Sequence, residues 1–247
     1  MEFHSHTLPN GLEILAEVNE EAHSESVGFF VRTGSRDESD DVAGVSHFLE
    51  HMVFKGTRTR SADEVNLLLD DMGSSSNART SEESTIYHAA VLPEFQTPAV
   101  ELLADLMRPA LRDEGFALEK KVIIEEIMMY EDQPPWGGYE RLMQQYFGDS
   151  GLGQSVLGSV ESVSGLNPDR MRAYHARRYA PGNVALDGAG RNSPFTGALV
   201  KGVKEPGRTL TGVMIEVRKE VLAATGGKQV PWDHSALTGD FYFHLAS

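Results

Sequence analysis

The 247-residue sequence lacks cysteine, long apolar runs and a recognisable leader segment. Without cysteine there can be no disulfide bond, no thiolate zinc site and no cysteine nucleophile. No apolar run approaches the roughly 18 residues that span a membrane, so we expect no membrane partner. The residues from Met1 to His6 show no charged region followed by an apolar core, the pattern of a secretory signal. We therefore expect a cytoplasmic protein.

Positive charge is also scarce, because 22 Lys and Arg stand against 37 Asp and Glu, a net charge of −15. Such a surface repels phosphate groups, so nucleic acid is not an expected partner. The charge would suit basic peptides, but acidic surfaces also keep proteins soluble, and we favour solubility as its meaning. Residues 188–247 hold 7 basic and 5 acidic residues, about +2, which leaves about −17 for the remainder.

The segment from His47 to His51 reads H-x-x-E-H. Residues three and four positions apart share one face of a helix, so both histidines can hold one metal ion with Glu50 beside it. Two imidazoles and a later carboxylate suit zinc, and a free carboxylate beside an open coordination position suits the activation of water. Short motifs also occur by chance, and the alternative is a solvated helical face with two unrelated histidines.

The residues around this motif favour a buried helix. Gly44 precedes the motif, and Gly56 closes the segment as a C-terminal glycine cap would. A buried cluster of histidine and glutamate needs partners, and a metal ion is the simplest one. The apolar residues in and around the motif are Val45, Phe48, Leu49, Met52 and Val53.

A second helix, predicted over residues 116–127 and stopped at Pro134, brings further carboxylates. Seven residues make nearly two helical turns, so Glu119 and Glu126 lie on one face. Glu125 points about 100° away from Glu126, which makes Glu126 the better inward carboxylate, with Glu119 behind it. The alternative is an ordinary amphipathic helix whose acidic residues are solvated.

These segments resemble a known family. The 11 residues from His47 to Thr57 are similar to the zinc helix of the pitrilysin, insulin-degrading enzyme and mitochondrial processing peptidase family, the inverted zincins. Eleven consecutive matching residues and a correctly placed distal glutamate make the resemblance specific. It covers about residues 1–186, and further matching segments are 77–81, 119–132, 157–163 and 174–183.

The resemblance implies a role for each of these residues. His47, His51 and Glu126 would bind Zn²⁺, and Glu50 would be the general base that deprotonates the attacking water. Glu119 matches the second acidic position of the family and would support the site from behind the zinc ligands. The implied reaction is hydrolysis of peptide bonds in a peptide or unfolded protein substrate.

The resemblance also implies a substrate-binding strand. Asn77 and Ala78 match a family strand whose backbone pairs with an extended substrate, by strand addition at a sheet edge. The alternative for Asn77 is a plain turn residue after residues 73–76. Six other histidines lack ligand spacing and are interpreted as structural or surface residues: His4, His6, His23, His88, His175 and His234.

The apolar pattern and the resemblance together predict an α/β (α+β) fold, a mixed, largely antiparallel sheet packed with helices, as in one half of a processing-peptidase-like two-domain unit. An Asn-Gly turn at residues 10–11 separates two strands, the second alternating over residues 12–18. Further strands are expected at residues 27–31, 75–80 and 84–92. The other expected helices cover about residues 61–72, 102–107, 139–147 and 167–179.

Residues 187–247 depart from the family pattern, which should continue as strand, helix, strand. They resemble the C-terminal part of bacterial caspase-like peptidases, but the half with the catalytic Cys and His is missing. We therefore predict a zinc metallopeptidase catalytic domain over residues 1–186, lacking its usual final strand-helix-strand, and a non-catalytic caspase-like fragment over residues 187–247. The alternative is a divergent end of the metallopeptidase domain, with a helix over residues 209–225.

Members of this family pair the zinc-bearing half with a second, similar half that supplies an Arg and a Tyr near the scissile bond. The chain shows no match to that half, so the resemblance implies a second homologous half or a partner subunit. The leading interpretation is a zinc endopeptidase or its catalytic subunit. The alternative is a non-catalytic partner subunit of a two-subunit processing peptidase, and the intact Glu50 favours the first.

Overall fold

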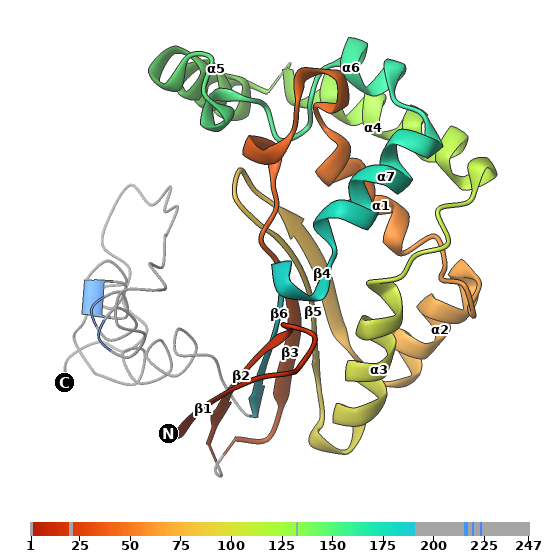
Figure 1. Ribbon diagram of the computed structural model, residues 1–247, viewed down its shortest axis with the longest axis vertical. Coiled ribbons are helices and arrows are strands. Elements are labelled where there is room, and N and C mark those ends of the chain that lie inside the picture. Colours follow the sequence, from red (N-terminus) through yellow and green to blue (C-terminus); the bar gives the residue numbers. More distant parts are fainter. Residues whose placement is uncertain are drawn as a thin grey trace, which may run out of the picture.

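The computed structural model describes residues 2–19, 22–131 and 133–190, together with residues 215, 216, 219 and 223. Its centre is a 6-stranded sheet with the order β1-β2-β6-β3-β5-β4 (Figure 1). Neighbouring strands are antiparallel except β2 and β6, which are parallel, so the predicted fold class is confirmed. The strands are β1 Glu2–Thr7, β2 Glu13–Val18, β3 Glu25–Val31, β4 Ser75–Thr80, β5 Thr85–Val91 and β6 Val184–Gly190.

The helices form a layer on one side of this sheet. Figure 1 shows α2 and α3 along one face of the sheet, with α1, α4, α6 and α7 gathered at one end of that layer, and α5 projecting from it. Contacts of α3 with β3 and β5, and of α1 with β4 and β5, join the two layers. The helices are α1 Val45–Val53, α2 Ala62–Asp71, α3 Gln96–Leu106, α4 Asp113–Glu131, α5 Pro134–Phe147, α6 Val160–Gly165 and α7 Pro168–Arg178.

Two apolar clusters meet at α1. The first lies between the sheet and helices α2 and α3, and it includes Val53 near the end of α1. The second joins α1 to α4, α6 and α7, and in it the rings of Phe48 and Phe116 stack with centroids 4.5 Å apart. Because α1 is buried from both sides, the side chains of its motif keep a fixed direction.

Local sequence signals correctly predicted several boundaries. At the start of α2, Ser61 accepts from the Glu64 N–H, and the Ser61 N–H donates to Glu64 Oε2 at 2.7 Å, a capping box that begins the helix expected over about residues 61–72. In the β1–β2 turn, the Leu12 N–H donates to the Asn10 side chain. Helix α5 begins at Pro134 rather than near Tyr139, because proline is well tolerated in the first helical turn. Helix α6, capped by Ser159, was not predicted.

Strand β6 lies in the middle of the sheet, between β2 and β3. It covers residues 184–190, so the predicted domain boundary after residue 186 falls inside this strand. The two-domain division itself remains a prediction, because nearly all of residues 191–247, with His234 and most of the alternative helix, lies outside the described residues. Among the described residues, no helix is both long and apolar enough to cross a membrane.

Candidate metal centre

Helix α1 begins at a tight junction that only glycine fits. Gly44 adopts φ 88°, and a Cβ there would lie 2.5 Å from the carbonyl oxygen of Leu157. Glu38 then caps the helix from a distance, because its carboxylate accepts from the Gly44 N–H at 2.6 Å and from the Ser46 N–H at 2.7 Å. An acceptor at this position satisfies free backbone donors and complements the positive end of the helix dipole.

The burial of Glu38 makes the stability of the fold depend on pH. Burial raises the pKa of Glu38 from 4.5 to about 7, although its hydrogen bonds to Ser46 and Gly44 oppose that rise. Between about pH 4.5 and 7, the Glu38 side chain is therefore protonated in the folded state and ionised in the unfolded state. The contribution of Glu38 to stability is therefore full below about pH 4.5 and is lost as the pH rises through about 7. Over that range the free energy of unfolding falls by about 3 kcal/mol.

Urea unfolding of chelator-treated wild type and Glu38→Gln at about pH 4 and about pH 8 measures this effect. Because Gln does not titrate, the stability of wild type relative to the variant should fall by about 3 kcal/mol between the two pH values. The other titrating groups cancel in this difference. The same difference at both pH values would contradict the expected role of Glu38.

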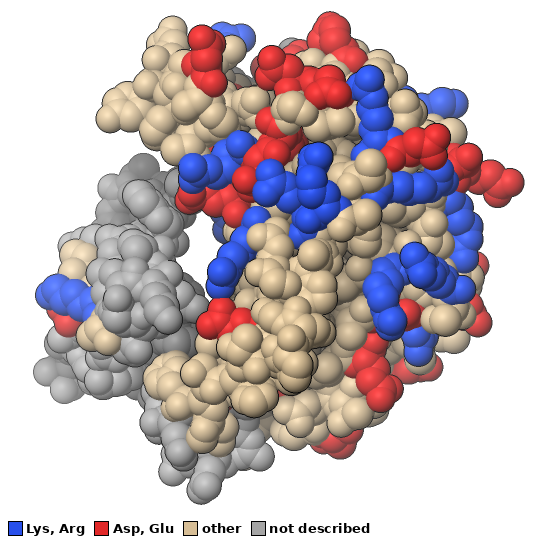
Figure 2. All heavy atoms as spheres, viewed as in Figure 1, with Lys and Arg blue, Asp and Glu red and all other residues tan. Residues whose placement is uncertain are grey.

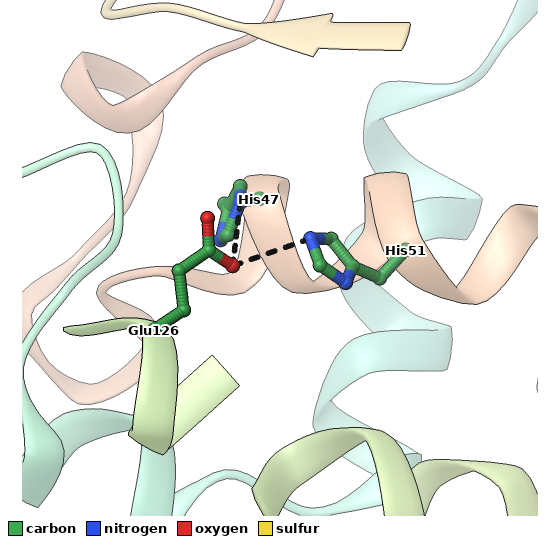
Figure 3. A group of neighbouring side chains, drawn as sticks. All are labelled: His47, His51 and Glu126. Carbon is green, nitrogen blue, oxygen red and sulfur yellow. Dashed lines mark ion pairs between the residues drawn. The ribbon is translucent and has the colours of Figure 1, made fainter. Parts of the chain in front are cut away.

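Three side chains converge beside α1 on one small volume. His47 and His51 project from α1, and Glu126 reaches them from α4 (Figure 3). Glu126 Oε2 lies 3.8 Å from His47 Nε2 and 3.6 Å from His51 Nε2, and one ligand atom from each residue lies within 4.8 Å of the others. Tetrahedral ligands at zinc distances are about 3.3 Å apart, so small side-chain shifts would let all three bind one ion.

The electrostatics of the two histidines fit a metal ligand set. Burial, together with the neighbouring His51, lowers the pKa of His47 to about 3, so His47 is neutral near pH 7, as a ligand must be. Its Nδ1 is buried with no hydrogen-bond partner among the described residues. His51 differs, because its Nδ1 lies 2.9 Å from Oε1 of Glu119.

Glu119 therefore lies behind a candidate ligand rather than among the converging ligand atoms. Its Oε2 lies 2.7 Å from Lys55 Nζ, and its side chain is buried. Burial tends to raise the pKa of Glu119, but hydrogen bonds from Lys55 and His51 outweigh it and lower that pKa. An ionised Glu119 can only accept, which assigns the His51 proton to Nδ1 and leaves Nε2 free to bind a metal.

Glu50 lies on the same helix but does not belong to the converging group of three. Its Oε2 accepts a 2.5 Å hydrogen bond from Thr80 Oγ1, at the end of β4. The pKa of Glu50 is raised, because burial outweighs the opposing effects of that hydrogen bond and of His51. The carboxylate is thus held beside the group of three by a neighbouring strand and is available to take a proton.

Asn77 and Ala78 lie in β4, which is the edge strand of the sheet on that side. The Ala78 N–H donates to the Asn77 side-chain oxygen at 2.9 Å. Sequence reasoning did not identify Thr80 or Lys55 as site residues. Thr80 reaches Glu50 because β4 lies against α1, and Lys55 reaches Glu119 because α4 packs on α1. Both residues do lie inside segments that carried the family resemblance.

Basic side chains gather over α7 on the face drawn in Figure 2, interspersed with acidic ones. Ion pairs join Arg170 to Asp41, Arg172 to Asp113 and Asp169, and Arg178 to Asp37. These arginines hold the segments before α1 and around α4 against α7. Their charges therefore serve the internal structure of the helical layer.

Comparisons with known proteins agree with this geometry. The model of the insulinase family, Peptidase family M16, matches residues 13–160. An uncharacterized zinc protease of Bacillus subtilis is 40% identical over 189 residues, covering 76% of this chain and 46% of that protein. The chain thus spans about half the length of this relative. A caspase-domain model matches residues 154–242, which confirms the second resemblance but starts earlier than the predicted boundary.

Solved structures with the same fold include a protease from Helicobacter pylori, with a TM-score of 0.74 at 22% identity, covering 98% of this chain and 54% of that one. A domain from Pseudomonas fluorescens, described as an inactive M16 peptidase domain, has a TM-score of 0.72 at 17% identity over 78% of this chain and 47% of that one. These likenesses concern the fold alone. The family itself follows from the family-model match over residues 13–160, together with the 40% identical zinc protease: the chain belongs to the insulinase family of peptidases, family M16.

Proposed function

We propose that this chain is the zinc-binding catalytic half of an endopeptidase that cleaves peptides held in an extended conformation. The observation that carries the proposal is the convergence of His47, His51 and Glu126, with Glu50 free of that group beside it. Relatives named zinc proteases support zinc as the ion. The alternative role, a non-catalytic partner subunit, gives no reason to keep Glu50 oriented by Thr80.

Each residue has a task in the proposed reaction. His47, His51 and Glu126 would hold Zn²⁺, which when bound supplies a Lewis acid that polarises the scissile carbonyl and acidifies water. Glu50 would take the proton from the attacking water and pass it to the leaving amine. Glu119 would keep the His51 ring oriented, and Thr80 would keep Glu50 oriented.

Strand β4 would bind the substrate backbone. Among the strands that the structure describes, β4 pairs with β5 alone, so its other edge can accept one more strand. The Ala78 N–H is satisfied by the Asn77 side chain, and a substrate carbonyl would take the place of that amide oxygen. Because α1 contacts β4, this strand lies next to the helix that carries Glu50.

The chain covers 46% of the Bacillus subtilis relative, so in this proposal a second half or partner subunit would complete the substrate-binding site. Zinc-dependent cleavage of internal bonds in unfolded peptides, followed by mass spectrometry, tests the proposal. The assay uses the chain alone and after addition of the C-terminal half of that relative. A matched peptide with methylated backbone nitrogens should be cleaved more slowly, since it cannot form the added strand. Zinc binding without cleavage in either assay would favour the partner-subunit role.

A further inference from the structure

Lys55 lies just beyond the C-terminal end of α1 and does not belong to the converging ligand group. Its Nζ lies 2.7 Å from Glu119 Oε2, and the other oxygen of the same carboxylate lies 2.9 Å from His51 Nδ1. One carboxylate thus links an ammonium group to an imidazole. The other ring nitrogen of His51, Nε2, lies 3.6 Å from Glu126 Oε2.

The burial of Glu119 distinguishes this arrangement from an ion pair between two surface side chains. The Glu119 side chain is 6% exposed, whereas that of Lys55 is 42% exposed. Exposed ion pairs contribute little, because water competes for both partners. A buried carboxylate with both oxygens engaged has a fixed plane, and it accepts the Nδ1 proton of His51 along one direction.

We propose that Lys55 is a positioning residue of the metal centre, which holds Glu119 so that the His51 ring is protonated at Nδ1 and presents Nε2 to the metal. The inference rests on the proposed zinc site and extends it to a residue outside the ligands and their direct partner. His47 gives the internal contrast, because its Nδ1 has no hydrogen-bond partner among the described residues. His51 is therefore the ligand whose ring is oriented before the metal arrives.

The test compares zinc affinities of the full chain, measured by competition with a chelator. Lys55→Met should weaken zinc binding by about 3- to 10-fold, less than the roughly 10- to 100-fold expected for loss of a direct ligand partner such as Glu119. Lys55→Arg should stay within about twofold of wild type, since it keeps the charge and the donors. Lys121→Met, at an exposed position of the same helix as Glu119, is the matched control and should leave affinity unchanged.

Coupling between the two residues separates positioning from a merely structural role. If Lys55 acts through Glu119, Lys55→Met should have no further effect in a Glu119→Gln background. Nitrogen chemical shifts of His51 in the zinc-free protein should show a loss of the Nδ1–H form in Lys55→Met. Unchanged affinity and tautomer, or an equal loss of affinity in both backgrounds, would overturn the inference.

A replacement variant and a wild-type control guard against misfolding and against a failure of the zinc site itself. Lys55→Gln replaces Lys55→Met if thermal unfolding shows that the latter does not fold. Failure of the wild type to bind zinc would refute the proposed function, whereas a normal wild type with an unaffected Lys55→Met variant would refute only the role of Lys55. The tautomer measurement needs no zinc and decides the role of Lys55 in either case.

Discussion

Replacing Glu50 with Gln is expected to lower the rate of peptide hydrolysis by about 10²- to 10⁴-fold, the usual contribution of a general base. Gln keeps the shape of the side chain and can still accept from Thr80, so the position of α1 should not change. It cannot take a proton from water. Zinc content should remain at the wild-type level, because Glu50 is outside the converging ligand group.

The measurement is the initial rate of cleavage of an unfolded peptide, beside zinc content from elemental analysis. Glu125→Gln is the matched control, because Glu125 is an exposed acid of α4 next to a candidate ligand. It should keep full activity. Wild-type turnover by Glu50→Gln would show that the mechanism proposed for Glu50 is wrong.

His51→Ala should remove zinc from the protein and abolish activity. The wild type is expected to hold about one zinc ion per chain. The variant loses a ligand outright and should lose more affinity than the roughly 10- to 100-fold caused by removing a partner of a ligand. It also leaves the buried Glu119 with Lys55 as its remaining partner, so some loss of stability should accompany the loss of metal.

Zinc content per folded chain, with circular dichroism as the check on folding, decides this prediction. His6→Ala removes an exposed histidine of β1 and is the matched control, with wild-type zinc content expected. Treatment of the wild type with a chelator should reproduce the inactivity of His51→Ala, and added zinc should reverse it only in the wild type. A well-folded wild type without zinc would favour the partner-subunit role.

The parts of the site that depend on local spacing could be predicted from the sequence. The H-x-x-E-H spacing and the seven-residue separation of Glu119 and Glu126 are properties of single helices, and helical geometry alone predicts which side chains share a face. The structure brings His47, His51 and Glu126 together, and helical geometry accounts for the shared faces. That the two helices meet was implied by the family resemblance and not by the spacing within either helix. The capping box at Ser61 is equally local, because all its atoms lie within one turn.

Features that depend on contacts between distant segments could not be predicted this way. Thr80 reaches Glu50 from a strand 30 positions further along, and no spacing in either segment indicates that contact. Lys55 gave no signal because its partner is on another helix. Strand β6 reads as Val-Ala-Leu followed by Asp187 and then small residues, which is a weak strand pattern. Its position is determined by pairing with β2 and β3.

The central position of β6 also affects how the chain can fold during synthesis. Strands β1 and β2 are complete early, and β3, β5 and β4 form their own antiparallel group. Among the strands that the structure describes, β6 alone joins the two groups. Until residues 184–190 leave the ribosome, β2 and β3 each present an unpaired edge, which is a template for pairing with other chains. The nascent protein is therefore most vulnerable to self-association, and most dependent on chaperones, after its metal-binding motif has been made and before β6 emerges.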